Sequence, residues 1–302
     1  MTMAVAALGS RGISATASGS QARSSTGREW SMHLSFVSHT GLQWRARSHR
    51  PLVSQYRKHR TRTAPLCLGS ILTVGASRGL GLEVVKALKS RGKGELTTAT
   101  VRQSKDASAV PVDSVKIVDV TDEENVRKVL KQGFDVVISC FGGRLDDEQR
   151  CDYSGNQNLI DALVEEVGTK RFVLVSALGA GDSESCLPMQ VLRGMRSFLL
   201  DKSRSELYLK ESGLPYTIVR TTPLSENSEY TGKAFLTESQ NCYGGIGRKD
   251  LAQLICDAVS SSKAENKLLY AVDRTKVLLT SPFVRPLEAW EALPDGVEAF
   301  EL

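Results

Sequence analysis

The chain has 302 residues, of which 39 are basic and 34 acidic, and its formal net charge is +5. The charge is unevenly distributed: residues 1–70 contain ten basic residues and one acid, which leaves 29 basic and 33 acidic residues in the remainder. The part of the chain that can form a globular domain is therefore mildly acidic, which argues against nucleic-acid binding through a basic surface.

Residues 1–69 are rich in Ser, Thr, Ala and Arg, and Glu29 is their single acid. They contain no apolar stretch long enough for a secretory signal or a membrane span. Because such a segment cannot bury enough apolar surface to fold, we interpret it as a disordered organellar transit peptide. The Ser/Thr-rich opening favours a chloroplast, in the stroma or associated with thylakoids, over a mitochondrion. A disordered basic tail and an incorrectly assigned start codon are the alternatives.

The remaining chain has a suitable size for one domain, which we place at residues 70–280. Residues 281–302 are interpreted as a tail with a short packed helix, or alternatively as a segment that docks on a partner. The six cysteines include no C-x-x-C pair, so neither a metal site nor a disulfide scaffold is predicted.

Residues 71–88 have the pattern of an apolar strand, a glycine-rich turn and an amphipathic helix. The glycines follow a G-x-x-x-G-x-G spacing, which gives a tight turn and lets backbone N–H groups approach a pyrophosphate at the helix N-terminus. An ordinary tight turn is the alternative. We predict a dinucleotide site, and the residues assigned to it here are Gly75, Ser77, Arg78, Gly79, Leu80 and Gly81.

The second strand, residues 96–101, runs into Arg102 at the position where an acidic residue would bind the adenosine ribose of NAD. An arginine instead accommodates a 2′-phosphate. Arg78, inside the glycine loop, adds a second cation. Both residues favour NADP(H) as the cofactor, although each could be an ordinary solvated arginine.

Strands and helices alternate along the rest of the chain. Strands are predicted at residues 114–120, 134–143, 171–176, 214–220 and 268–272, and helices at residues 123–133, 156–167, 190–211 and 250–258. Val/Ile-rich runs separated by helices predict an α/β fold with a doubly wound parallel sheet, a Rossmann fold. Residues 225–245 are polar and irregular and are expected to form a rim over the cofactor. Asp250 is interpreted as an acid in the first turn of the helix that follows.

Ligands of such sheets bind beyond the carboxyl ends of the strands. The residues that this rule adds to the predicted cofactor site are Asp119, Val120, Cys140, Phe141 and Gly142, with Ser176 and residues 221–223 along the same edge.

Several segments together resemble the atypical short-chain dehydrogenase/reductases, in particular their NmrA-like and flavin-reductase-like branch, which includes plastid proteins. The matching pieces are residues 74–81, 101–102, 118–122, 152–159, 170–176, 202–206, 212–220 and 247–252. The glycine spacing departs from the G-x-x-G-x-x-G usual in that branch and matches the classical short-chain enzymes. The resemblance covers residues 71–275 and implies a nicotinamide cofactor.

The resemblance also implies a catalytic Ser, Tyr and Lys, with the Tyr four residues before the Lys. Lys202 fits the lysine, where it would bind the nicotinamide ribose, but Phe198 occupies the tyrosine position and has no proton to donate. Ser176 is the candidate serine, although Ala177 occupies the following position, which often carries the hydroxyl. Lys202 and Glu206 are spaced i, i+4, so an ion pair on the helix surface is the alternative for Lys202.

Two functions are therefore predicted as alternatives. The first is an NADP(H)-dependent oxidoreductase that acts on a small or planar acceptor without the standard tyrosine. The second is a non-catalytic NADP(H)-binding redox sensor or an assembly factor for plastid complexes, with a plastid protein as its partner. No nucleic-acid partner and no transmembrane segment are expected.

Overall fold

The computed structural model describes residues 69–143, 151–166, 168–225, 229–240, 243–276 and 298–302. The predicted transit peptide lies outside these residues except for its last residue, Gly69. Among the helices in the described ranges, none combines the length and the apolar character needed to cross a membrane.

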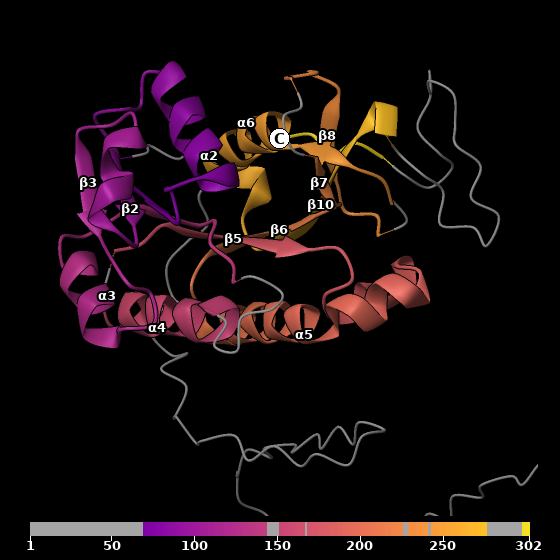
Figure 1. Ribbon diagram of the computed structural model, residues 1–302, viewed down its shortest axis with the longest axis horizontal. Helices are drawn as coiled ribbons and strands as arrows, with labels where there is room; N and C mark the ends of the chain where they lie inside the picture. The colour runs from indigo at the N-terminus through magenta and orange to yellow at the C-terminus, as the bar shows by residue number, and fades with distance from the viewer. Residues whose placement is uncertain (1–68, 144–150, 167, 226–228, 241–242, 277–297) are drawn as a thin grey trace, which may run out of the picture. The chain divides into compact units, whose positions relative to one another are not determined.

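A single large sheet forms the centre of the described part (Figure 1), and its strands lie in the order β3-β2-β1-β4-β5-β6-β10-β8. Their bounds are β1 Ile71–Val74, β2 Thr97–Val101, β3 Ser114–Ile117, β4 Val136–Ser139, β5 Arg171–Ala177, β6 Tyr216–Thr221, β8 Ala234–Thr237 and β10 Lys267–Asp273. All neighbours pair in parallel except β10 and β8, which are antiparallel. This arrangement confirms the predicted doubly wound Rossmann fold.

Helices cover both faces of the sheet, with α2 and α6 on one side and α3, α4 and α5 on the other (Figure 1). Their bounds are α2 Gly79–Ser90, α3 Glu123–Leu130, α4 Cys151–Glu165, α5 Met189–Ser212 and α6 Arg248–Ser260. Short 3₁₀ turns lie at η1 Ser104–Ala109, η2 Gly181–Cys186, η3 Ser262–Ala264 and η4 Arg274–Lys276, and two short strands, β7 Leu224–Ser225 and β9 Ile246–Gly247, pair with each other.

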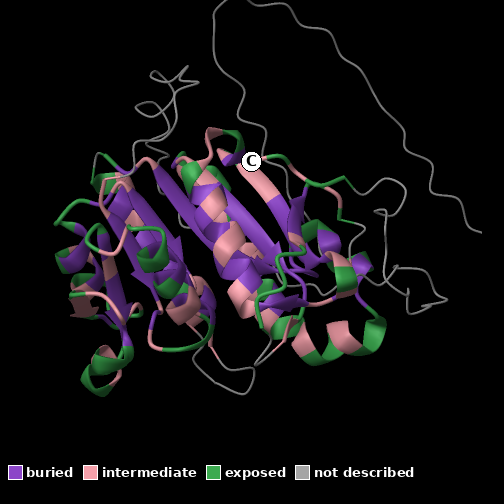
Figure 2. Ribbon diagram, turned by 90° about the horizontal axis from the view of Figure 1, so that it is seen from above, coloured by how far each residue is buried: buried purple, intermediate pink, exposed green. Residues whose placement is uncertain are grey.

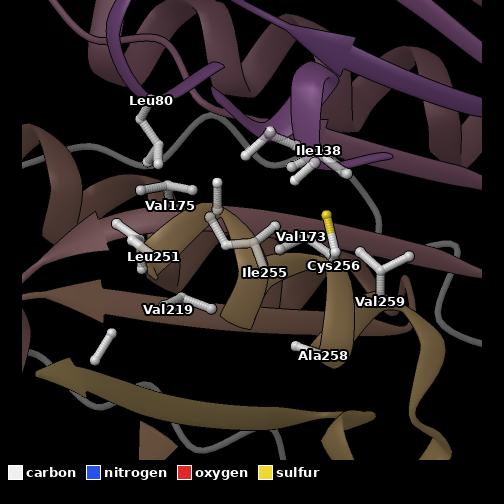
Figure 3. Close-up of a cluster of buried hydrophobic side chains, with 14 of the residues drawn as sticks. Leu80, Ile138, Val173, Val175, Val219, Leu251, Ile255, Cys256, Ala258 and Val259 are labelled. Atoms are coloured by element: carbon white, nitrogen blue, oxygen red, sulfur yellow. The ribbon is translucent and has the colours of Figure 1, made fainter. Parts of the chain in front are cut away.

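Alternate strand residues pack toward opposite helix layers, as the pleat requires. On β5, Val173 and Val175 belong to the cluster beneath α2 and α6 (Figure 3), whereas Phe172 and Leu174 belong to the cluster beneath α3, α4 and α5. Seen from the α2 and α6 side, buried strands lie under helices that expose part of their outer surface (Figure 2). Two apolar layers therefore hold the sheet in place and fix where its strands end.

Several predicted element limits were wrong, among them the end of the fourth strand, which is Ser139 and not residue 143. Helix α4 begins at Cys151, five residues before the predicted start at Asn156. The third strand ends at Ile117 rather than residue 120. Strand β8 was missed because its four residues lie in a polar segment, and it forms by pairing with the edge of β10.

The predicted tail helix falls mostly on residues 277–297, which lie outside the described residues. Residues 298–302 are not helical. Instead, the backbone N–H of Phe300 donates to the carbonyl of Leu236 on β8, and the Phe300 side chain packs on the cluster beneath α6.

Replacing Ile255 by Ala tests the packing of α6 on the sheet. Ile255 is fully buried, so Ile255→Ala is expected to lower the free energy of unfolding by about 2 to 5 kcal/mol through lost apolar contact and a residual cavity. Urea denaturation of the full chain measures the change. The control is Leu200→Ala on α5, where the side chain is 46% exposed and an effect within about 0.5 kcal/mol is expected. Equal effects of the two variants would contradict this packing.

Candidate functional site

The turn between β1 and α2 contains two glycines, Gly75 and Gly81, at which a side chain would collide with neighbouring backbone. Gly75 has φ of 86°, in the left-handed region, and a Cβ placed on Gly81 would lie 2.2 Å from the carbonyl oxygen of Gly75. Helix α2 begins at Gly79, and its N-cap residue, Arg78, provides no side-chain hydrogen bond to the first turn. The first turn of α2 therefore has N–H groups without a capping side chain, and a bound phosphate would fit there.

The two predicted phosphate-binding arginines flank this turn. Arg78 and Arg102 are exposed, and within the described residues neither side chain makes a hydrogen bond or an ion pair. The N–H of Val118 donates to the carbonyl of Val101, which brings the end of β3 beside Arg102. Two hydrogen bonds from Thr121, assisted by the charge of Arg102, hold the pKa of Asp119 below its usual range. A negative group and a positive group thus lie next to each other where β2 and β3 end.

The end of β4 approaches the glycine turn closely. A Cβ on Gly75 would lie 2.8–2.9 Å from atoms of Phe141, and the N–H of Cys140 donates to the carbonyl of Val74. The side chains of Val120 and Phe141 pack against Gly155 on α4, so these two residues can offer mainly backbone atoms to a ligand. Burial raises the pKa of Cys140 to about 12, which makes its thiol neutral and a weak nucleophile at physiological pH.

Lys202 lies on α5 and is 5% exposed. Its ammonium nitrogen is 3.0 Å from a carboxylate oxygen of Asp152, 3.2 Å from the carbonyl of Val175 and 3.4 Å from the carbonyl of Phe141. The two carbonyl contacts are hydrogen bonds, whereas the contact with Asp152 is an ion pair, and that buried carboxylate oxygen accepts no hydrogen bond within the described residues. Lys202 is therefore bonded to the ends of β4 and β5 and to α4 at the same time.

Asp152 completes this arrangement from the first turn of α4. Its side chain is fully buried, and its second carboxylate oxygen accepts from the N–H of Gly143 at 2.8 Å. Sequence reasoning did not assign Asp152 a role, although a buried acid in the first turn of a helix needs a partner. We infer that Asp152 fixes Lys202 against the backbone of Phe141 and Gly142.

Ser176 belongs to a second polar group. The strand register aligns Ser176, Arg220 and Tyr270 across β5, β6 and β10. The Ser176 hydroxyl, 2% exposed, donates to Glu206 at 2.5 Å, and Arg220 donates to both oxygens of Glu206. Arg220 also donates to Asp182, and this hydrogen bond lowers the pKa of Asp182. These contacts make Ser176 a donor within a buried network.

One sequence alternative was wrong. Lys202 and Glu206 do not form an i, i+4 surface pair, because Lys202 pairs with Asp152 and Glu206 pairs with Arg220. Both side chains are buried, and a buried charge is stabilised by an opposite charge that is buried beside it. Arg220 could have been noticed in the sequence as a charge that ends a buried strand.

Comparisons with known proteins agree with this geometry. Residues 75–262, well over half of the chain, match the model of a family described as NAD(P)H-binding, and the chain belongs to that family. The predicted resemblance to the NmrA-like and flavin-reductase-like branch is thereby confirmed, and the fold is oxidoreductase-like with reductases among its neighbours.

Three similar proteins illustrate the match. An uncharacterized chloroplastic protein of Arabidopsis thaliana is 29% identical over 220 residues, covering 68% of this chain and 77% of the relative. Sanguinarine reductase of Eschscholzia californica is 27% identical over 145 residues, covering 44% of this chain and 52% of that protein. The solved structure of ChuY, an anaerobillin reductase of Escherichia coli O157:H7, has a TM-score of 0.60 and 25% identity, and the match covers 68% of this chain and 97% of ChuY.

The Lys202–Asp152 pair can be tested by a thermodynamic cycle. Lys202→Met removes the charge and leaves a buried carboxylate unpaired, so the free energy of unfolding is expected to fall by about 3 to 5 kcal/mol. Adding Asp152→Asn should recover part of that loss, because the unpaired charge is then gone. Urea denaturation of the wild type, both single variants and the double variant measures the coupling.

The control for this cycle is Lys249→Met, since Lys249 pairs with Glu229 on the surface. Its unfolding midpoint should stay at the wild-type value. Additive effects of Lys202→Met and Asp152→Asn would contradict the pairing.

Proposed function

We propose that this protein is an NADP(H)-dependent oxidoreductase that reduces a small or planar, largely apolar acceptor. The observation that carries the proposal is the uncapped first turn of α2, with its close-packed glycines, flanked by the exposed side chains of Arg78 and Arg102. Anionic ligands are favoured there by the helix N-terminus and by both guanidinium groups. The membership of the NAD(P)H-binding family supports the same cofactor class.

The cofactor residues fall into three groups along the strand ends. The proposed set is Gly75, Ser77, Arg78, Gly79, Leu80 and Gly81 for the pyrophosphate, Arg102 with Arg78 for the 2′-phosphate, and Asp119, Val120, Cys140, Phe141, Gly142 and Lys202 for the nucleosides. When bound, the reduced cofactor supplies a hydride. Lys202 and Asp152 also contribute by keeping the backbone at Phe141 and Gly142 in place, because the ammonium donates to the carbonyls of Phe141 and Val175 and pairs with Asp152.

The acceptor side is expected next to the end of β5. Ala177 and Leu178 belong to an apolar cluster against which the partly buried side chains of Met195, Phe198 and Tyr243 pack. An apolar surface of this kind suits a planar apolar molecule, and one relative of the chain is a reductase, sanguinarine reductase. Ser176 is proposed to stabilise this region through Glu206 rather than to touch the acceptor.

The source of the proton is proposed to be water. Phe198 occupies the position of the usual phenol, and its ring lies 5.6 Å from the ammonium of Lys202. The acceptor gains a hydride from the cofactor and a proton from solvent, so two electrons and two hydrogens are transferred in total. The protein contributes orientation and electrostatics, as it does in many cofactor-dependent enzymes.

We further propose that the protein acts in the chloroplast after removal of residues 1–69. The composition of that segment supports this location, and so does the chloroplastic relative of Arabidopsis. The mitochondrial alternative gains no support from the relatives.

A non-catalytic NADP(H) sensor or assembly factor with a plastid protein partner is the second candidate, and Phe198 is the residue that favours it. A screen that follows NADPH oxidation with quinones and flavins separates the two. Tight NADPH binding without turnover would support the sensor.

Cofactor preference is the first test of the proposal. Each charge-assisted contact to the 2′-phosphate should contribute about 1.5 to 3 kcal/mol, so NADPH is expected to bind at least about tenfold more tightly than NADH. Arg102→Ala should remove most of this difference. Isothermal titration of both nucleotides measures it, and equal affinities of the wild type for NADPH and NADH would overturn the preference.

The proton source is tested at position 198. If water supplies the proton, Phe198→Tyr should change kcat by less than about tenfold, or about 1.4 kcal/mol, on the acceptor that the screen yields. Phe198→Leu serves as the control for the loss of the aromatic ring. A gain of about a hundredfold in Phe198→Tyr alone would mean that the site is arranged for a phenol donor.

A further inference from the structure

Arg248 is the first residue of α6, and its side chain lies beside the glycine turn at the start of α2. A Cβ placed on Gly79 would be 3.8 Å from Nε of Arg248. Helices α2 and α6 lie side by side on the same face of the sheet (Figures 1 and 2). Two helix N-termini and one guanidinium group therefore meet next to the predicted pyrophosphate position.

The backbone around Arg248 is firmly held. Residues Ile246 and Gly247 of β9 pair with β7, and Arg248 Nη1 lies 3.5 Å from the carbonyl of Ser225. Two residues later, Asp250 is 1% exposed and accepts from the N–H groups of Thr231 and Gly232. The start of α6 is thus fixed by contacts on both sides, which limits the freedom of the Arg248 side chain.

The next residue of α6 is also a cation, and it lies on the surface. Lys249 pairs with Glu229 at 2.8 Å on the surface, where the Lys249 side chain is 43% and the Glu229 side chain 88% exposed. Successive helix positions differ by about 100° in direction, so Arg248 faces the glycine turn while Lys249 faces solvent. The helix start therefore offers two adjacent cations, of which only the arginine lies by the turn.

We propose that Arg248 binds the pyrophosphate of the nicotinamide cofactor from the α6 side, opposite the backbone N–H groups of the glycine turn. This inference rests on the proposed function, since it requires a dinucleotide in the turn. The guanidinium group presents a planar set of N–H donors that matches phosphate oxygens, and the positive ends of α2 and α6 favour the same anion. Through Ser225, the same side chain connects the cofactor to β7 and β9.

Isothermal titration of the full chain tests the proposal with two probes, NADPH and adenosine 2′-monophosphate. The second probe carries the 2′-phosphate but no pyrophosphate. Arg248→Ala is expected to weaken NADPH binding by at least about tenfold, the effect of one charge-assisted hydrogen bond, while the affinity for adenosine 2′-monophosphate changes by less than about twofold. Arg248→Gln, which keeps polarity and most of the length, should show the same selectivity and replaces Arg248→Ala if that variant fails to fold.

Two further variants serve as controls. Lys249→Ala should bind both probes like the wild type, because Lys249 faces away from the turn. Arg102→Ala should weaken both probes, because both contain the 2′-phosphate.

The remaining outcomes separate this inference from the proposed function. A wild type that binds no NADPH would refute the proposed function itself. If both Arg248 variants bind NADPH with the wild-type affinity, the inference alone is overturned. An equal loss of affinity for both probes would also overturn it, because this result would indicate a general effect on the fold. A raised KM for a carboxylate-bearing acceptor with unchanged NADPH affinity would also overturn it, since Arg248 would then bind the acceptor.

Discussion

The buried pair between Lys202 and Asp152 is the interaction on which the arrangement of the site depends. It joins α5 to α4 and bonds both to the ends of β4 and β5. A pair with both charges out of water is retained only where good geometry offsets the cost of desolvation. Here each partner also bonds to backbone, Lys202 to the carbonyls of Phe141 and Val175 and Asp152 to the N–H of Gly143. The backbone that a nucleoside would contact is thereby held in one position.

The hydrogen bonds and ion pairs of the polar side chains limit what the protein itself can contribute to proton transfer. Lys202 donates to two backbone carbonyls and pairs with Asp152, the Ser176 hydroxyl is bonded to Glu206, and Phe198 has no ionisable group. The charged side chains in this region hold helices and strand ends in place. A reaction at this edge of the sheet would therefore depend on the cofactor and on solvent, which is compatible with the apolar cluster that follows β5.

The fold could be predicted because its signals are local. Glycine is needed at positions 75 and 81 because the backbone of the turn comes close to itself within these seven residues. The Val/Ile runs of β4 and β5 indicate strands that are buried on both faces of the sheet. The polar contacts could not be predicted, because Lys202 and Asp152 lie 50 residues apart and meet only after α4 and α5 pack. The i, i+4 spacing of Lys202 and Glu206 suggested a local pair, yet burial of both gave each a distant partner. Strand β8 likewise forms through pairing with β10, for which its own sequence gives little signal.

Three arginines differ in burial, and their different roles could not be distinguished from the sequence. Arg220 is 1% exposed and is bonded to Glu206, Asp182 and Tyr270, so its charge is neutralised inside the protein. Arg102 is exposed at the end of β2, with Asp119 as a neighbouring charge. Arg248 lies between these extremes, half-buried beside a helix N-terminus. A guanidinium group attracts an outside anion more strongly where solvent is partly excluded. The capacity of this edge to hold phosphates therefore depends on the arginines near α2, and the buried Arg220 network contributes rigidity instead.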